Sequence, residues 1–276
     1  MPGGELAGRA RVGEGREAEV FAWDEGTVLR LLRPSNDPTR VEREATALRA
    51  AADGGVDVSE VYGTITVDGR PGVIMDRVDG PDLIALMGKR PSTVPRVARI
   101  VGHAQARMHD VVAPDDLPNL RKLVRKKIEA AAELPAELAD FALKKLDALP
   151  DGNRLCHGDF HPGNVLLGRG GAAVIDWTDA TRGDPAADLA RTRLLLRQGA
   201  VPRHMPAMIR GMQAYGRGVF FRLYVRAYAR ARPIDDDLVD RWEIVRVADR
   251  GRSRAATGRP AVWSLGRAKG PGWVGS

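Results

Sequence analysis

The sequence has a single cysteine, Cys156, and no stretch of about 18 apolar residues. One cysteine cannot form an internal disulfide, which suits a reducing compartment, and a transmembrane helix needs about 20 mostly apolar residues. Residues 1–15 lack the cationic start and apolar stretch of a signal peptide. No internal repeat of fixed period occurs. We therefore expect a cytoplasmic protein with no membrane partner.

Lysine is scarce relative to arginine, and the positive charge is unevenly distributed. Residues 191–276 carry 18 Lys and Arg against 6 Asp and Glu, whereas residues 1–190 carry 25 against 30. A basic region of this kind can attract nucleic acid or an anionic substrate. A compositional preference for arginine explains the same excess, and no nucleic-acid-binding motif accompanies it. We therefore expect no nucleic acid partner, which salt-dependent binding to a random duplex would test.

The first 80 residues predict a small sheet with one helix. The chain of 276 residues, 43% of them hydrophobic, is long enough for one large domain or two modest lobes. Short β-branched and apolar runs are broken by glycine or charge, and Asp68-Gly69 is a hairpin signal between two of them. Val41, Ala45 and Leu48 recur at helical spacing and predict the helix.

After Gly80 the pattern becomes mainly helical. A short helix beginning at Pro81 is followed by predicted helices over residues 94–112 and 119–149. Short strands follow, and helices resume from Asp184 to about residue 250. The last stretch, to residue 276, is rich in Gly and Pro and predicts a loose tail. A small sheet joined to a larger helical lobe indicates a bilobal enzyme with a cleft.

Residues 155–167, LCHGDFHPGNVLL, place four polar side chains in one tight turn between two apolar segments. His157, Asp159 and His161 alternate, and three such ligands on one side of a strand could hold a metal ion. The rest of the turn does not supply a strong zinc-binding set. A metal site is therefore the weaker of two interpretations.

The other interpretation is a phosphoryl-transfer loop. In the catalytic loop of protein kinases an asparagine follows the catalytic aspartate by five positions, and Asp159 and Asn164 have that spacing. Phosphoryl transfer needs a carboxylate that positions the attacking hydroxyl and an amide oxygen that holds a metal ion. The turn at Pro162-Gly163 brings both groups to one transferred phosphate.

Three further segments fit phosphoryl transfer and occur in the expected order. Gly13 and Gly15 stand between two predicted strands, and small residues let backbone N–H groups approach phosphates. Asp176 ends an apolar strand twelve residues after Asn164, where a second metal ligand belongs. Glu44 borders the buried face of the predicted helix, from which it can reach a cation on the neighbouring strand.

LCHGDFHPGNVLL followed by VIDWTDATRGDPAADLA resembles the aminoglycoside phosphotransferase family of small-molecule kinases, over about residues 8–250. The HGDxHxxN…IDW…GDPxxDLA set is highly specific, whereas the Gly-rich loop and residues 201–276 match weakly. Members of this family transfer the γ-phosphate of ATP to a hydroxyl of an antibiotic or a metabolite. The resemblance implies that this chain is such a phosphotransferase, with a small-molecule hydroxyl compound as its partner.

The fold implied by the resemblance is α+β and protein-kinase-like. It has two lobes, a small N-terminal antiparallel sheet with one helix and a larger, mainly helical C-terminal lobe. We expect a nucleotide-binding lobe over residues 1–80 with a hinge at 76–80, a catalytic and acceptor-binding lobe over 81–250, and the tail at 251–276.

The resemblance also implies roles around the catalytic loop. Asp159 is the catalytic base, and His161 approaches the γ-phosphate. His157 braces the loop from inside. Asp184 and Asp188 tie the following helix to the loop.

ATP and Mg²⁺ are the cofactors that the resemblance implies. Asn164 and Asp176 are the implied metal ligands. Backbone groups of Asp76 and Val78 are expected to meet adenine, with Met75 behind it. The full set of implied nucleotide-binding residues is Gly13, Gly15, Arg30, Glu44, Met75, Asp76 and Val78.

Arg30 departs from the family pattern, which has a lysine on the third strand paired to the helix glutamate. Arginine keeps the positive charge and can bind phosphate in a bidentate manner, but its shape differs from that of lysine. The departure leaves open a second possibility, a nucleotide-binding pseudokinase with a scaffold or regulatory role. The presence of Asp159, Asn164 and Asp176 favours an active kinase.

The acceptor is predicted not to be a polycation. Helices in residues 191–250 should line its pocket, and they carry 13 arginines against 6 Asp and Glu. The acidic cluster Asp235–Asp237 follows Pro233 and has a structural reason to start a helix. A polycation would need carboxylates to pair its ammonium groups when they leave water.

Overall fold

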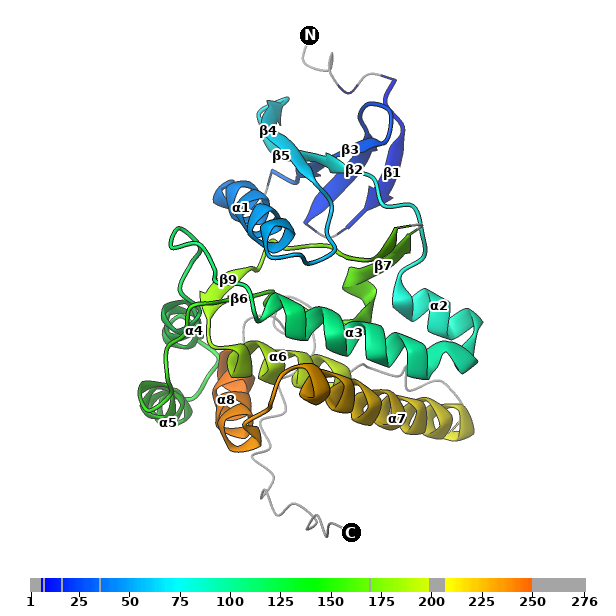
Figure 1. The fold of residues 1–276 in the computed structure, drawn as a ribbon. Coiled ribbons are helices and arrows are strands. Elements are labelled where there is room, and N and C mark those ends of the chain that lie inside the picture. Colours follow the sequence, from blue (N-terminus) through cyan, green and yellow to red (C-terminus); the bar gives the residue numbers. More distant parts are fainter. Residues whose placement is uncertain are drawn as a thin grey trace.

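The computed structural model describes residues 6–249 except residues 7, 16, 35, 169 and 199–206. For residues 198 and 207–215 it describes the backbone alone. The tail predicted for residues 251–276 lies outside the described residues. Figure 1 shows a small sheet at one end of the molecule and a larger, mainly helical part at the other, as the sequence predicts.

The N-terminal part is an antiparallel sheet of five strands in the order β1-β2-β3-β5-β4. Its strands are β1 (Arg11–Glu14), β2 (Ala18–Ala22), β3 (Thr27–Leu32), β4 (Val61–Val67) and β5 (Arg70–Asp76). Asp68 and Gly69 have φ angles of 50° and 73°, which form the predicted tight turn between β4 and β5. Arg30 of the central strand β3 lies opposite Val20 of β2 and Val73 of β5, so the sheet fixes its position.

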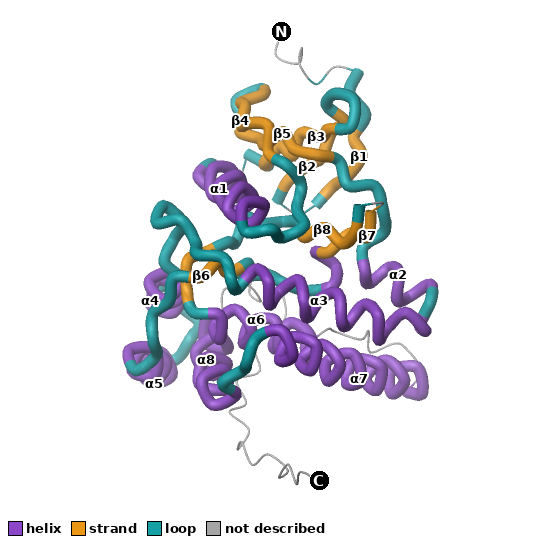
Figure 2. Tube along the Cα trace, viewed as in Figure 1, coloured by secondary structure: helices purple, strands orange, loops and turns teal. Residues whose placement is uncertain are grey.

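Helix α1 (Thr39–Asp53) packs against this sheet, as Figure 2 shows. Its buried apolar residues include the three predicted from helical spacing: Val41, Ala45 and Leu48. They share one core with Val28 of β3. Tertiary burial of an apolar face supplies most of the stability of a helix of this length. The same face carries Glu44, so packing of α1 turns this carboxylate toward the sheet.

The C-terminal part is built mainly from helices. They are α2 (Leu83–Lys89), α3 (Val94–Met108), α4 (Leu120–Glu129), α5 (Ala136–Asp147), α6 (Pro185–Gln198), α7 (Ala207–Ala231) and α8 (Asp236–Asp249). α3 packs along α7, and α6 packs against α8 (Figure 1). Large buried aromatic side chains fill the core between them, including Trp177, Tyr224 and Trp242. Within the described part of the chain, every helix is too short or too polar to cross a membrane.

The single helix predicted over residues 119–149 is wrong. The structure has two helices there, because α4 ends at Glu129 and α5 begins at Ala136, directly after Pro135. Proline has no N–H to donate, and its ring clashes with the preceding helical turn. It can stand at the start of α5 but not inside a continuous helix.

Two short antiparallel strand pairs frame the loop that carries Asp159. They are β6 (Arg154–Cys156) with β9 (Thr181–Gly183), and β7 (Val165–Gly168) with β8 (Gly171–Val174). Asp159 and Asn164 therefore lie in the connection from β6 to β7, and Asp176 follows β8. An isolated bridge between Val58 and Val174 joins this region to the N-terminal part.

Candidate active site

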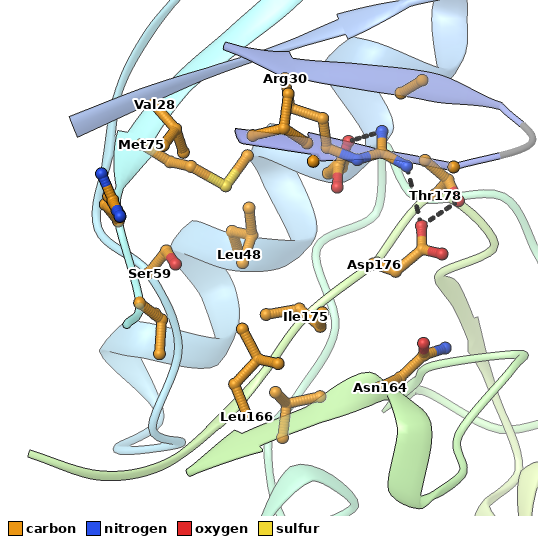
Figure 3. Close-up of a pocket in the computed structure, with 18 of the residues that line it drawn as sticks. Val28, Arg30, Leu48, Ser59, Met75, Asn164, Leu166, Ile175, Asp176 and Thr178 are labelled. Carbon is orange, nitrogen blue, oxygen red and sulfur yellow. Dashed lines mark hydrogen bonds and ion pairs between the residues drawn. The ribbon is translucent and has the colours of Figure 1, made fainter. Parts of the chain in front are cut away.

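A cavity of about 600 Å³ lies between the N-terminal sheet and the C-terminal part (Figure 3). Its lining includes ten of the eleven residues predicted for the site: Gly13, Gly15, Arg30, Glu44, Met75, Asp76, Val78, Asp159, Asn164 and Asp176. The remaining one, His161, is not part of the lining. Residues more than a hundred positions apart in sequence thus meet in one cavity, and their roles there stay predictions.

The loop that carries Asp159 requires glycine at position 158. Gly158 has a φ of 82°, and a Cβ there would lie 2.4 Å from the backbone oxygen of Asp179. Only glycine fits both restrictions. After the short helical turn η2 (Pro162–Asn164), the Asn164 Nδ2 donates to the backbone oxygen of Asp159 at 3.0 Å. This hydrogen bond orients the amide and leaves its oxygen free for another partner.

His157 braces the loop from inside, as predicted. Its side chain is fully buried, and its Nε2 donates to the backbone oxygen of Ile175 at 3.0 Å. Its Nδ1 accepts from the backbone N–H of Asp159 at 3.3 Å, and its ring packs on Trp177. Both ring nitrogens are thus used inside the protein. Among the described residues no group of three or more His, Cys, Asp and Glu could hold a metal ion, so the H-x-D-x-H metal site finds no support.

Asp188 of α6 ties that helix to the loop, as the sequence predicts. Its carboxylate accepts from the backbone N–H of Gly158 at 2.7 Å and from that of His157 at 3.3 Å. Gln105 of α3 and His109, which directly follows that helix, donate to the same group at 3.2 and 3.1 Å. Burial alone would raise the pKa of Asp188, but the His109 hydrogen bond and charge, with the Gly158 N–H, hold it well below its usual range.

Replacing Asp188 by asparagine is expected to destabilise the fold. At about pH 7 the free energy of unfolding should fall by roughly 1–3 kcal/mol, because buried donors lose their acceptor. The folded-state pKa lies below the ordinary value of 3.8, so the carboxylate stabilises the fold above that value and stops doing so as the pH falls through the folded pKa. Urea denaturation should therefore show a smaller difference between wild type and D188N at about pH 3 than at about pH 7.

The matched control is Asp140→Asn, on the exposed side of α5. It should change stability by no more than about 0.5 kcal/mol at either pH, as surface substitutions usually do. If the difference in free energy of unfolding between wild type and D188N were the same at about pH 3 as at about pH 7, the role assigned to the carboxylate would be wrong.

The predicted ion pair between β3 and α1 is confirmed, and Figure 3 shows that it extends to Asp176. The Arg30 Nη1 lies 2.7 Å from the Glu44 Oε2, and its Nη2 lies 2.9 Å from the Asp176 Oδ1. The side chain of Glu44 is 1% exposed and that of Arg30 is 13% exposed. Burial raises the pKa of Glu44 to about 7 against the opposing charge of Arg30. Burial disfavours the charge of Arg30, but Glu44 and Asp176 raise its pKa above the usual value.

Asp176 and Asn164 offer the oxygen donors that a divalent cation needs. Asp176 has a φ of 63°, which is unusual for a residue other than glycine and is found at functional sites. Its Oδ1 accepts from Arg30 and, at 2.9 Å, from the Thr178 hydroxyl. Among the described residues, no hydrogen bond uses its Oδ2. One carboxylate and one amide oxygen, completed by phosphates and water, are a donor set that fits Mg²⁺.

The other end of the cavity is an apolar slot. Its walls include Val28, Leu48, Met75, Leu166 and Ile175 (Figure 3). Apolar walls with a few polar groups suit a flat aromatic ring. The backbone N–H of Asp76 is already donated to Glu60, whereas no hydrogen bond between described residues uses the backbone of Val78. Of the two predicted hinge residues, Val78 therefore has the freer backbone for a ring.

The phosphotransferase enzyme family matches residues 9–234, which is most of the chain. The chain belongs to this family. The fold of this phosphotransferase is similar to that of a type VIII aminoglycoside-3'-phosphotransferase, with a TM-score of 0.62, 19% identity, and 86% of this chain and 92% of that chain covered. No curated protein matches the chain in sequence.

Two further solved structures share the fold. A choline/ethanolamine kinase family protein from Mesorhizobium loti has a TM-score of 0.59 and 20% identity, with 93% of this chain and 83% of that chain covered. An aminoglycoside phosphotransferase from Streptomyces rimosus in complex with ADP and streptomycin has a TM-score of 0.57 and 16% identity. The match covers 90% of this chain and 94% of that chain. At such identities the likeness concerns the fold alone.

His161 of the phosphotransferase lies beside Asp159 but outside the cavity lining. Its Nδ1 accepts from the backbone N–H of Gly163 at 3.0 Å, and its Nε2 lies 3.8 Å from the Asp159 Oδ2. Burial lowers the pKa of His161, although the charge of Asp159 acts in the opposite direction. This histidine shapes the turn after Asp159, and its approach to a phosphate stays a prediction.

Arg191 lines the cavity, although the sequence does not single it out. It lies on α6, where its Nε donates to the backbone oxygen of Gly158 at 3.2 Å and its Nη2 lies 3.3 Å from the Asp159 Oδ1. In the sequence it is one of 13 arginines over residues 191–250, and nothing in that excess distinguishes it from the others. A helical spacing of three from Asp188, which already contacts the loop, is the signal that could have identified Arg191.

Proposed function

We propose that this phosphotransferase moves the γ-phosphate of ATP to a hydroxyl group of a small molecule. The observation that carries the proposal is the convergence of Asp159, Asn164 and Asp176 at one end of a cavity that ends in an apolar slot. A nucleotide can place its ring in the slot and its phosphates beside these polar groups. The family match supports phosphoryl transfer, and the ADP in one related structure supports nucleotide use.

Asp159 would orient the acceptor hydroxyl and receive its proton. The carboxylate stands on a loop whose backbone is held by Asp188 and His157, so its position is fixed before a substrate binds. Such preorganisation, together with charge neutralisation, supplies most of the rate enhancement in phosphoryl transfer. Arg30 would add a positive charge near the transferred phosphate, from a position that Glu44 fixes.

Asn164 and Asp176 would hold Mg²⁺ through the Asn164 amide oxygen and the free Asp176 oxygen. A bound Mg²⁺ ion neutralises charge on the β- and γ-phosphates and orients them. Thr178 and Arg30 orient the Asp176 carboxylate through its other oxygen.

The direct test is ATP consumption by the purified protein with a panel of alcohols, with the phosphorylated product identified by mass. The panel should include aminoglycosides, macrolides, choline, nucleosides and hydroxy acids. Turnover that depends on one acceptor class is the expected result. Binding of ATP without turnover of any acceptor would instead favour the pseudokinase, although Arg30 retains the pairing to Glu44 that a lysine would make.

Removal of divalent cations is expected to abolish turnover, and added Mg²⁺ should restore it. In Asp176→Asn the Mg²⁺ concentration for half-maximal turnover should rise at least about tenfold, the factor that corresponds to about 1.4 kcal/mol of lost binding. Full activity in the presence of a chelator would contradict the proposed metal role. Asp82→Asn, at the N-cap of α2, is a control outside the cavity lining and should keep the wild-type requirement.

A further inference from the structure

One turn of helix α6 holds the loop that carries Asp159 at two points. Asp188 accepts from the backbone N–H of Gly158 at 2.7 Å, and the Arg191 Nε donates to the backbone oxygen of the same glycine at 3.2 Å. Residues three apart on a helix are neighbours on its surface, so both side chains reach the loop together. The N–H and the carbonyl of Gly158 are thus both bound to α6.

The main chain of Asp159 is also fixed on both sides. Its N–H donates to the His157 Nδ1 at 3.3 Å, and its carbonyl oxygen accepts from the Asn164 Nδ2 at 3.0 Å. These contacts determine where the backbone of Asp159 lies, but they leave its side chain free to rotate. A side chain without a partner has several staggered positions open to it. The position of the carboxylate therefore depends on a further contact.

Arg191 supplies that contact. Its Nη2 lies 3.3 Å from the Asp159 Oδ1, and its side chain is only 15% exposed. Because the Nε of the same guanidinium binds the Gly158 carbonyl, the planar group cannot turn without breaking one of the two hydrogen bonds. A lysine ammonium is a point charge on a flexible stem and lacks this fixed plane.

The two carboxylate oxygens of Asp159 have different surroundings. Oδ1 is bound by Arg191, whereas Oδ2 takes part in no hydrogen bond within the part of the chain that the structure describes. The His161 Nε2 lies 3.8 Å from Oδ2, which is beyond hydrogen-bond distance. The side chain of Asp159 is 34% exposed and lines the cavity, so Oδ2 is the oxygen that a ligand can reach.

Two other arginines of α6 are paired elsewhere. Arg193 pairs with Asp236, and Arg197 pairs with Glu243. Neither arginine lines the cavity, whereas Arg191 does. The arginine excess of this region is therefore a poor guide to the site, and the contact with Asp159 is what distinguishes Arg191.

We propose that Arg191 is a positioning residue for the transfer: it holds the Asp159 Oδ1 so that Oδ2 faces the acceptor hydroxyl and takes its proton. This inference rests on the proposed function. In the transfer, the acceptor oxygen forms a bond to the γ-phosphorus, the bond from that phosphorus to the bridging β–γ oxygen breaks, and ADP leaves with that oxygen. The hydroxyl proton passes to Oδ2 and then to solvent, while Oδ1 keeps its hydrogen bond from Arg191.

The first experiment measures kcat and KM of Arg191→Met with the best acceptor of the panel. We expect kcat to fall at least about tenfold, because a small misplacement of a reacting group can cost about a hundredfold in rate. KM for ATP and for the acceptor should stay within about threefold of wild type. In Arg191→Lys, which keeps the charge without the planar group, kcat should lie between the wild-type and R191M values. A higher acceptor KM with unchanged kcat would overturn the proposal, because Arg191 would then bind the acceptor itself.

A double variant tests whether Arg191 acts through Asp159. R191M/D159N should turn over within about threefold of D159N, because no base is left to position. If R191M lowered kcat as much in the D159N background as in the wild type, Arg191 would act independently of Asp159 and the proposal would be wrong. The matched control is Arg197→Met, on the same helix but 49% exposed and outside the cavity lining, which should keep the wild-type kcat.

The last experiment needs no turnover, so it decides the role of Arg191 even if the proposed function fails. Crystal structures of the wild type and of R191M, both with ADP and Mg²⁺, are compared. In the wild type we expect one position of the Asp159 carboxylate, within about 3.5 Å of the guanidinium. In R191M we expect at least two positions, with the loop backbone unchanged because Asp188 still holds it.

Two results would overturn the positioning role: the same single carboxylate position in R191M as in the wild type, or a wild-type carboxylate that does not contact Arg191. ADP binding within about threefold of the wild-type affinity would show that R191M is folded. Arg191→Gln also removes the guanidinium and carries the same expectation if R191M does not fold.

Discussion

Replacing Asp159 by asparagine is expected to lower kcat by at least about a hundredfold, the usual contribution of a positioned general base. The amide cannot take the hydroxyl proton, although it has almost the same shape as the carboxylate. The nucleotide should still bind within about threefold of the wild-type affinity, since the apolar slot and Arg30 are unchanged. Steady-state kinetics with the best acceptor of the panel and ADP titration measure the two effects separately.

Asp116→Asn is a suitable control, because Asp116 is an exposed aspartate outside the cavity lining. It should retain wild-type turnover. If D159N kept turnover within about tenfold of the wild type, less than a general base supplies, Asp159 would not be the base. In that case the contact that Arg191 makes with the side chain at position 159 would have no role in catalysis.

Replacing Arg30 by methionine is expected to have the largest effect on stability. Glu44 is 1% exposed and would lose the cation at 2.7 Å that compensates its charge. Breaking a buried pair by removing one partner costs about 3–5 kcal/mol. Turnover should fall as well, because the charge near Asp176 disappears. Urea denaturation measures the first effect and the kinetics of the best acceptor the second.

The loss of unfolding free energy in R30M should depend on pH, because the carboxyl group of Glu44 changes its protonation state near neutral pH. Burial raises the pKa of this carboxyl to about 7 even with Arg30 present, and removal of the cation raises it further. A group with a raised folded pKa supports the fold at low pH and loses that contribution as the pH rises through the folded pKa. The difference in free energy of unfolding between wild type and R30M should therefore be smaller at about pH 6 than at about pH 8.

Two variants separate the ion pair from a general loss of packing. R30M/E44M lacks both charges. Its free energy of unfolding should return most of the way from the R30M value to the wild-type value, since apolar replacement of a buried pair is often neutral. Arg33→Met removes a partly exposed arginine that pairs with the exposed Glu14, so it should cost no more than about 1 kcal/mol. A double variant as unstable as R30M would show that packing, not the charge, is responsible.

The sequence by itself determined the order of elements and the residues of the loop. Strands and helices differ in hydrophobic period, and the Asp68-Gly69 turn has its own chemistry, so the sheet with α1 was predictable. Asp159 and Asn164 were predictable because they lie five residues apart in one turn. Local spacing sufficed for these features, since each depends on neighbours along the chain.

The tertiary structure decided what depends on distant neighbours. The burial of Glu44 follows from packing of α1 on the sheet, which sequence periodicity places only at the border of the apolar face. The contact of Arg191 with Asp159 joins residues 32 positions apart. The pKa of a charged side chain depends on its burial and on the charges that folding brings close to it. The spacing of residues along the chain shows neither of these.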